Sequence, residues 1–269
     1  MLQHTIRKET SISGIGLHTG KKVHVKFSPA KVNSGIVFIR TDLPGHPGIK
    51  ADLSNISSTA RGTNLAGIHT IEHILSALYA LSVTNLEVRL DGPEPPALDG
   101  SSKPYCDLVI KAGIADQGSK IKCIKVTNPV FAMEDGKCLI ALPSDRFTVS
   151  FMINYPIDFI GTQFHKFELN SRKYVSEIAP ARTYGFVDEV EALKKRGLAF
   201  GATTKNAVAI GKNGWLTKLR FTDELVRHKI LDLIGDLSLL QVDIKAHVIG
   251  IKSGHDLNIK FAKKLEEVG

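Results

Sequence analysis

The alternation of apolar and polar residues in the first part of the chain predicts strands followed by helices. In the segment KKVHVKFSPA, Val23, Val25 and Phe27 fall on one face of an extended chain, as in a half-buried strand. From Ile68 to Leu81, apolar residues recur at the spacing of a helix. In chain order, the predicted elements are strands over 21–30 and 35–42, a helix over 68–81, a strand over 85–92 and a helix over 105–114.

The second half of the chain repeats this order. Its segments are strands over 135–145 and 147–153, a helix over 223–240, a strand over 246–254 and a helix over 258–268. Because five elements recur in one order, we interpret the chain as two duplicated α+β domains, 1–118 and 119–269. The second helix stands farther from its preceding strands, so the second domain carries an insertion of about 40 residues within 154–220.

Composition excludes several classes of protein. The 269 residues are 43% hydrophobic and 23% charged, which is typical of a globular chain and not of a disordered or fibrous one. No apolar run approaches the ~18 residues of a transmembrane helix, and MLQHTIRKETSISG has no apolar core of a secretion signal. Cys106, Cys123 and Cys138 form no Cys-x-x-Cys pair, so we expect a cytoplasmic protein without disulfides.

The net charge favours an anionic partner. The chain has 35 basic and 27 acidic residues, a balance of +8, which suits a nucleic acid, an anionic membrane surface or a phosphorylated small molecule. A nucleic-acid-binding α+β protein is one alternative, but the chain lacks a concentrated basic stripe and has one Trp and five Tyr. We therefore expect a small-molecule substrate, no nucleic acid and, for the oligomeric state, a monomer.

Two histidines, His73 and His228, occupy equivalent places on the first long helix of each half. If these helices pack together, both imidazoles meet at one seam. Asp232 follows His228 by four residues, so both side chains project from one helical face, as two ligands of one metal must. Two histidines and a carboxylate form a hydrolytic zinc site and also suit ferrous iron. Glu72 would be the general base beside that metal.

A second zinc pattern overlaps the first. The string from His69 to His73 is H-T-I-E-H, which matches the His-x-x-Glu-His pattern of inverzincin peptidases. That alternative makes His69 a ligand and leaves His228 and Asp232 without a role, so we rank it second.

His255 lies in KSGHDLN, where we expect an exposed loop between the last strand and the last helix. There it could act as general acid for a leaving amine. Asp236 lies four residues beyond Asp232 on the same predicted face, where it could orient and charge that imidazole. GIGLHTG (14–20) lacks the spacing of a nucleotide-binding loop, so we interpret it as a β-turn with His18 a bystander or an entrance residue.

Together these segments resemble one family, the zinc-dependent UDP-3-O-acyl-N-acetylglucosamine deacetylases, which commit bacteria to lipid A synthesis. The resemblance covers nearly the whole chain, through SISGIGLHTGKKV, IHTIEHILSALYAL, LDGPEPPALDGSSKPY, APARTYGF, LVRHKILDLIGDL and SGHDLNIKF. It implies a fold of two α+β domains of like topology, with helices packed between two β-sheet layers. It also implies hydrolysis of the substrate's N-acetyl group, with a second-domain insertion that forms an apolar tunnel for the acyl chain.

The resemblance also implies residue roles. It makes His73, His228 and Asp232 the zinc ligands and Glu72 the base. His255, paired with Asp236, becomes the general acid or an electrostatic stabiliser. Thr183 would hydrogen-bond the oxyanion, and Lys229 would help bind the nucleotide-sugar. Further substrate contacts are implied at Tyr184, Phe186, Leu198 and Gly201.

The acyl-chain segment implied by the resemblance runs over about 183–211. Its apolar side chains could line a tunnel, or they could pack the insertion onto its own domain; they are Phe186, Val187, Val190, Leu193, Leu198 and Phe200. Two positions depart from the family. Tyr184 stands where Phe is common, which bears on acyl-chain preference. Asp256 follows His255 where a small or basic residue is usual, which bears on the titration of that histidine.

Overall fold

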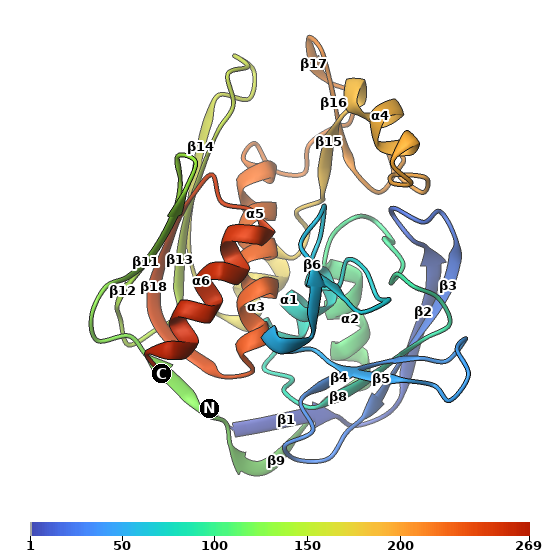
Figure 1. The fold of residues 1–269 in the computed structure, drawn as a ribbon, viewed down its shortest axis with the longest axis vertical. Helices are drawn as coiled ribbons and strands as arrows, with labels where there is room; N and C mark the ends of the chain where they lie inside the picture. The colour runs from blue at the N-terminus through green and yellow to red at the C-terminus, as the bar shows by residue number, and fades with distance from the viewer. Residues whose placement is uncertain (1) are drawn as a thin grey trace.

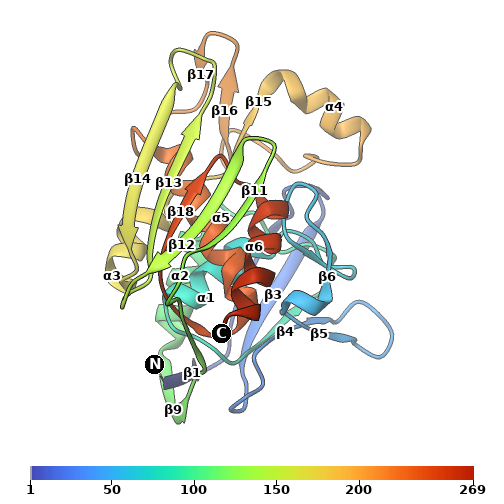
Figure 2. The same cartoon turned by 60° about the vertical axis from the view of Figure 1, so that its left-hand side comes forward.

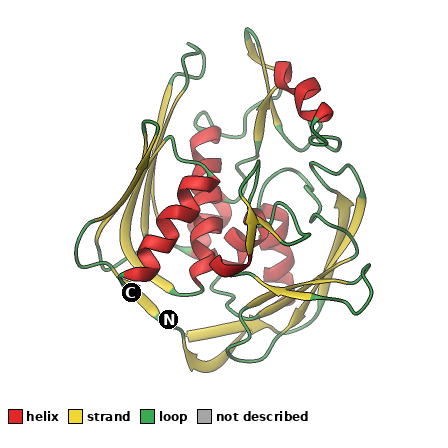
Figure 3. Ribbon diagram, in the orientation of Figure 1, coloured by secondary structure: helices red, strands yellow, loops and turns green. Residues whose placement is uncertain are grey.

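The computed structural model describes residues 2–269 and places a layer of helices between two main β-sheets (Figures 1 and 3). This confirms the predicted α+β class, with helices packed between two sheet layers. The helices of the central layer are α1 (Glu72–Ala80), α2 (Lys103–Ala112), α5 (Glu224–Leu237) and α6 (His255–Glu267).

The first sheet has the strand order β2-β3-β8-β4-β5. Its neighbours pair antiparallel, except that β8 and β4 are parallel. Val23, Val25 and Phe27 point into the core and are almost fully buried, as the alternation predicts. The strands span Thr10–Ile15 (β2), Lys22–Pro29 (β3), Ile36–Arg40 (β4), Gly48–Lys50 (β5) and Leu86–Leu90 (β8).

The second sheet has the order β11-β12-β18-β13-β14 and the same succession of strand directions, with β18 and β13 as its parallel pair. A short strand, β10, also pairs parallel with β18. The two sheets therefore share both strand order and strand direction. The strands span Cys123–Lys125 (β10), Val130–Glu134 (β11), Lys137–Pro143 (β12), Thr148–Asn154 (β13), Thr162–Glu168 (β14) and Asp243–Ile251 (β18).

The chain leaves the first half through β9 (Ile114–Lys120), which pairs antiparallel with β1 (Leu2–Ile6). The predicted seam between residues 118 and 119 lies inside β9. Because β9 pairs with β1, the first half extends to the end of β9 at Lys120. The chain enters the second sheet only after that residue.

Two helices begin three or four residues away from their predicted starts. The helix predicted over 68–81 begins only at Glu72, because Ile68 forms a β-bridge with Leu65 and Thr70 has a positive φ of 56°. The last helix begins earlier than predicted, at His255, so this histidine is the first residue of α6 rather than a loop residue.

Each half carries extra elements between its last edge strand and its long helix. In the second half these are more numerous, and Figures 1 and 2 show β15, β16, β17 and α4 standing together at one end of the molecule. None of the described helices is long and apolar enough to cross a membrane. The extra elements are η1 (Leu53–Asn55), β6 (Ile56–Ser58), β7 (Asn64–Leu65), α3 (Ser171–Lys173), η2 (Tyr174–Ile178), β15 (Tyr184–Phe186), η3 (Val187–Glu189), α4 (Val190–Lys195), β16 (Val208–Gly211) and β17 (Gly214–Trp215). The short helix η4 (Ser238–Leu240) follows α5.

Candidate metal centre and active site

The candidate site lies where α1 of the first half packs against α5 of the second. Gly235 permits this close approach, because a Cβ atom there would lie 2.3 Å from the backbone oxygen of Glu72. Any side chain at this position would force the two helices apart. The contact sets the rings of His73 and His228 5.1 Å apart between centroids, at an interplanar angle of 86°. The two histidines therefore meet at one seam, as their equivalent places in the sequence predict.

His73, His228 and Asp232 are buried, and each offers one ligand atom within 4.8 Å of the others. Asp232 Oδ1 lies 3.3 Å from His228 Nε2 and 3.9 Å from His73 Nε2. His228 Nδ1 donates to the backbone oxygen of Ala181 at 3.1 Å, which leaves Nε2 for the centre. Two imidazole nitrogens and a carboxylate oxygen suit a divalent metal such as zinc or ferrous iron. This group could therefore hold a metal ion.

Electrostatics favour the protonation states that bind metal. Burial, followed by the charge of His228, lowers the pKa of His73 to about 3. Burial also lowers the pKa of His228. Burial alone would raise the pKa of Asp232, but electrostatic interactions with His228, Lys229 and His255 outweigh it and lower that pKa. Neutral imidazoles and an ionised carboxylate are the ligand forms.

Glu72 places its carboxylate beside the same centre. Its Oε2 accepts a hydrogen bond of 2.9 Å from the backbone N–H of Thr63, and its Oε1 lies 4.0 Å from His255 Nε2. Burial raises the pKa of Glu72 to about 7, against the opposing charge of His255. A carboxyl group with a pKa near neutrality can both accept and release a proton.

His255 forms a pair with Asp236, as the helical spacing of Asp236 predicts. The distance from His255 Nδ1 to Asp236 Oδ2 is 2.9 Å. Burial opposes the protonation of His255, but Asp236 outweighs it and raises the pKa of the imidazole to about 9. The expectation of an exposed loop histidine is wrong, because the ring lies against the buried Asp236 and only 14% of its side chain is exposed.

Thr63 is a buried residue of this site that the sequence patterns do not reveal. Its N–H donates to Glu72, and its hydroxyl donates to Asp236 Oδ1. The same hydroxyl lies 3.3 Å from His255 Nδ1. Thr63 therefore contacts both candidate proton carriers, Glu72 and His255. It stands between short irregular segments, where neither helical nor strand periodicity marks it.

A cavity of about 440 Å³ opens from this centre. On one side it is lined by Glu72 and the metal-ligand group, and on the other by apolar residues of the insertion. The predicted tunnel residues that line it are Phe186, Val187, Val190 and Leu193. Leu198, Phe200 and Gly201 are not among its lining residues, and Phe200 is 56% exposed.

The GIGLHTG segment forms another part of the cavity wall. His18 lines the cavity, so it is not a bystander. The backbone oxygens of Leu17 and His18 accept hydrogen bonds of 3.0 and 3.1 Å from the N–H groups of Gly201 and Phe200. The buried carboxylate of Glu94 accepts from the N–H groups of His18 and Thr19 at 2.8 to 3.1 Å. This loop therefore ties the insertion to the first half, and Glu94 holds the loop in place.

Thr183, Tyr184 and Lys229 also line the cavity. Thr183 is fixed through its backbone, whose N–H donates to Gly100 and whose oxygen accepts from Val208, both at 2.8 Å. The hydroxyl groups of Tyr184 and Tyr155 are 3.0 Å apart. Lys229 Nζ donates to Asp232 Oδ2 at 2.7 Å and lies 5.8 Å from the centroid of the Tyr184 ring. All three residues thus lie beside the metal-ligand group.

His69 lies outside this centre. It is exposed and precedes α1, and its N–H donates to the backbone oxygen of Pro93 at 2.8 Å. Within residues 2–269, the group with metal-ligand geometry is His73, His228 and Asp232, without His69. The inverzincin arrangement is therefore not favoured. Asp256 is likewise exposed, and its carboxylate pairs with Lys260 at 2.7 Å rather than with the site.

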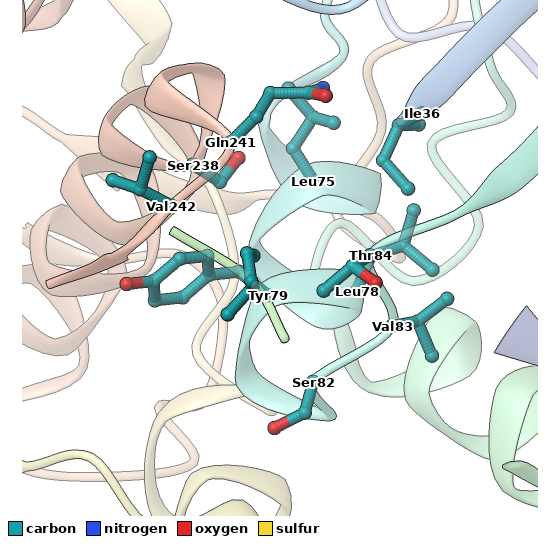
Figure 4. Close-up of a pocket in the computed structure, with 11 residues that line it drawn as sticks. Ile36, Leu75, Leu78, Tyr79, Ser82, Val83, Thr84, Ser238, Gln241 and Val242 are labelled. Carbon is teal, nitrogen blue, oxygen red and sulfur yellow. The ribbon is translucent and has the colours of Figure 1, made fainter. Parts of the chain in front are cut away.

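A second cavity, of about 40 Å³, lies along the C-terminal part of α1 (Figure 4). Leu75 and Tyr79 face Ser238 and Val242 across it. Its volume corresponds to a few water molecules and is too small for a substrate. The chemistry of the seam is therefore concentrated at the other end of α1.

Comparison with known proteins shows what this chain is similar to. The family model LpxC, described as UDP-3-O-acyl N-acetylglycosamine deacetylase, matches residues 3–267. A protein named UDP-3-O-acyl-N-acetylglucosamine deacetylase from Citrifermentans bemidjiense is 41% identical over 98% of this chain and 89% of its own length. Proteins of the same name from Chlamydia abortus and Bdellovibrio bacteriovorus are 40% and 38% identical, over 99% and 98% of this chain and 97% and 89% of their own lengths.

Proposed function

This chain belongs to the UDP-3-O-acyl N-acetylglycosamine deacetylase family, and on that premise we propose that His73, His228 and Asp232 bind zinc while Glu72 and His255 carry the protons. The enzyme hydrolyses the N-acetyl group of UDP-3-O-acyl-N-acetylglucosamine and releases acetate, in lipid A biosynthesis. It is a metal-dependent deacetylase. The observation that carries the residue assignment is the buried three-ligand group with both proton carriers beside it.

The ligand group suits zinc because it offers two neutral imidazoles and one carboxylate and leaves a coordination position open. When bound, zinc lowers the pKa of a coordinated water towards about 7 and polarises a carbonyl group. Ferrous iron accepts the same ligands, so the native metal is decided by elemental analysis.

Glu72 takes the proton of the attacking water, since its raised pKa places it near neutrality in a buried site. As the water oxygen bonds to the acetamide carbon, Thr183 donates a hydrogen bond to the developing oxyanion. His255, kept protonated by Asp236, gives its proton to the leaving amine nitrogen when the C–N bond breaks. Acetate and the free amine are the products.

The cavity suits a substrate with one charged and one apolar part. Lys229 lies beside Tyr184 on the wall, where its ammonium would bind a phosphate of the uridine diphosphate. Phe186 and the apolar side chains that follow it would take the acyl chain. Leu198 and Gly201 would act on that chain only through the packing of segment 183–211.

We also propose that the predicted units 1–118 and 119–269 are domains related by duplication, supported by the shared order and direction of their strands. The three free thiols, Cys106, Cys123 and Cys138, support a cytoplasmic enzyme, because thiols persist in a reducing compartment.

The test combines elemental analysis with a deacetylation assay on protein purified anaerobically. Wild-type protein is expected to hold one zinc ion per chain. His228→Ala is expected to lose both metal and turnover, because two ligands bind a divalent ion poorly in water. His69→Ala is the control and should keep both. A His228→Ala protein that retained one zinc ion per chain would overturn the ligand assignment.

A further inference from the structure

The carboxylate of Asp236 has a third hydrogen-bond donor besides His255 and Thr63. Asn258, on α6, donates its side-chain amide N–H to Asp236 Oδ2 at 2.8 Å. The same oxygen accepts from His255 Nδ1 at 2.9 Å, while the hydroxyl of Thr63 donates to Oδ1. Both oxygens of this fully buried carboxylate are therefore held by donors.

The two donors to Oδ2 come from one face of one helix. His255 is the first residue of α6, and Asn258 lies three residues further along, a spacing that makes their side chains neighbours on the helix surface. Asp236 comes from α5, which packs against α6. Because one oxygen serves both donors, the carboxylate cannot turn away from the imidazole without also losing the hydrogen bond from Asn258.

The hydrogen bond to Asp236 is the one that the side chain of Asn258 makes within residues 2–269. Only 2% of Asn258 is exposed, and its Oδ1 is buried without a donor from the described residues. A buried polar atom without a partner lowers the stability of the fold. A leucine of about the same size would fill the place without that loss, so packing does not explain an amide here. The polarity of Asn258 therefore acts on Asp236.

The first half shows what helix packing requires at the place of Asp236. Asp236 stands eight residues after His228, and Leu81 stands eight residues after the equivalent histidine, His73. Leu81 belongs to the hydrophobic core. An apolar side chain thus satisfies the packing at this place in the first half. The buried carboxylate and its donors in the second half are therefore not a requirement of the shared topology.

The orientation of Asp236 decides where the ring of His255 points. With Nδ1 bound to Asp236, the other ring nitrogen, Nε2, lies 4.0 Å from Glu72 Oε1 and 3.9 Å from Asp232 Oδ2. A rotated carboxylate would let the ring move, and a displacement of about 1 Å at a reacting group can lower a rate by about 10²-fold. Asn258 bonds to Asp236 and not to these groups, so it would act on the reaction only through the imidazole.

We propose that Asn258 is a positioning residue of the deacetylase: it fixes the carboxylate of Asp236 and thereby directs His255 Nε2 at the metal-ligand group. The inference rests on the proposed role of His255 as proton donor. The spacing from His255 to Asn258 is visible in the sequence, but the hydrogen bond from α6 to α5 that gives Asn258 its role appears only in the fold.

The test measures kcat, KM and bound zinc in Asn258→Leu, which keeps the approximate size of the side chain and removes the donor. We expect kcat to fall by about 10- to 100-fold, with KM and zinc content close to wild type. Asn258→Ser, whose hydroxyl is too short to reach Asp236, should show a similar loss and guards against misfolding caused by the leucine. Ile259→Ala is the matched control: it removes buried volume from the next residue of α6 and should lower the melting temperature while kcat stays near wild type.

A double variant separates positioning from a general loss of structure. If Asn258 acts through His255, adding Asn258→Leu to His255→Gln should lower kcat by less than about 2-fold further. A structural role would lower kcat in that background by as much as in wild type. The proton NMR signal of the His255 Nδ1–H, assigned by its loss in His255→Gln, is a second measurement. We expect it to shift or broaden in Asn258→Leu and to stay unchanged in Ile259→Ala.

Three results would overturn the proposal. The first is a near-wild-type kcat in Asn258→Leu with zinc retained. The second is an equal loss from Asn258→Leu in the wild-type and His255→Gln backgrounds. The third is a His255 signal that Asn258→Leu leaves unchanged. Near-normal turnover in His255→Gln alone is a different result, because it would overturn the proposed function of His255 itself, and the role of Asn258 with it.

Discussion

The two halves of this chain share a sheet topology but contribute unequally to the site. The first half supplies Glu72 and His73, both from α1. The second supplies His228 and Asp232 from α5 and the imidazole of His255 from α6. Neither half holds three candidate ligands, and each holds one candidate proton carrier. The site therefore depends on both halves and forms only where α1 packs against α5.

Among changes that leave the metal ligands in place, the largest expected effect comes from removing either proton carrier. Glu72→Gln and His255→Gln are each expected to lower kcat by about 10²- to 10⁴-fold, the usual contribution of a general acid or base. Both variants should retain one metal ion per chain, because neither residue belongs to the ligand group. Single-turnover assays and elemental analysis measure the two quantities. Near-normal turnover in one variant would show that the residue replaced in it does not carry a proton, so that the two halves do not share the proton transfer.

A smaller effect is expected at Thr63, which the first half places against both carriers. Thr63→Val removes the hydroxyl donor to Asp236 but keeps the N–H donor to Glu72. We expect kcat to fall by about 10- to 100-fold, as for other groups that orient a functional side chain, with KM little changed. Thr63→Ser keeps the hydroxyl and should recover most of kcat. Equal losses in the two variants would indicate packing rather than hydrogen bonding.

The smallest effect should come from the insertion, which only the second half carries in this form. Leu193 lines the cavity, so Leu193→Trp should obstruct a long acyl chain. We expect kcat/KM for a long-chain substrate to fall roughly 10-fold relative to a short-chain one, in line with about 1–3 kcal/mol for misfit in an apolar pocket. Leu198→Trp is the matched control, because Leu198 does not line the cavity. An equal loss in both variants would contradict the assignment of this wall.

Several features of the site could be predicted from sequence because they rest on regular spacing. His228, Asp232 and Asp236 recur every four residues, so one helical face had to carry all three, and the structure has them there. His73 could be brought to them only through the repeated order of elements. These predictions depend on whether a segment is a helix or a strand, but not on the residues at which it begins and ends.

Other features depend on contacts that no spacing reveals. The start of α1 is set by Thr70, whose left-handed backbone conformation interrupts an otherwise helical pattern. Thr63 and Glu94 act through hydrogen bonds to residues far along the chain. In the insertion, Leu193 and Phe200 are equally apolar, yet only Leu193 lines the cavity. Which apolar side chain turns inward is decided by tertiary packing, here by the backbone contact of Phe200 with His18.

The close contact at Gly235 has a consequence for the heat resistance of the protein. Because the candidate ligands come from α1 and α5, a metal ion that binds all three binds only the chain in which the halves are docked. Such an ion stabilises the docked state by about 1.4 kcal/mol for each tenfold excess over its dissociation constant. The ion therefore also holds the two halves together, and the melting temperature of the enzyme should rise with the concentration of free metal around it.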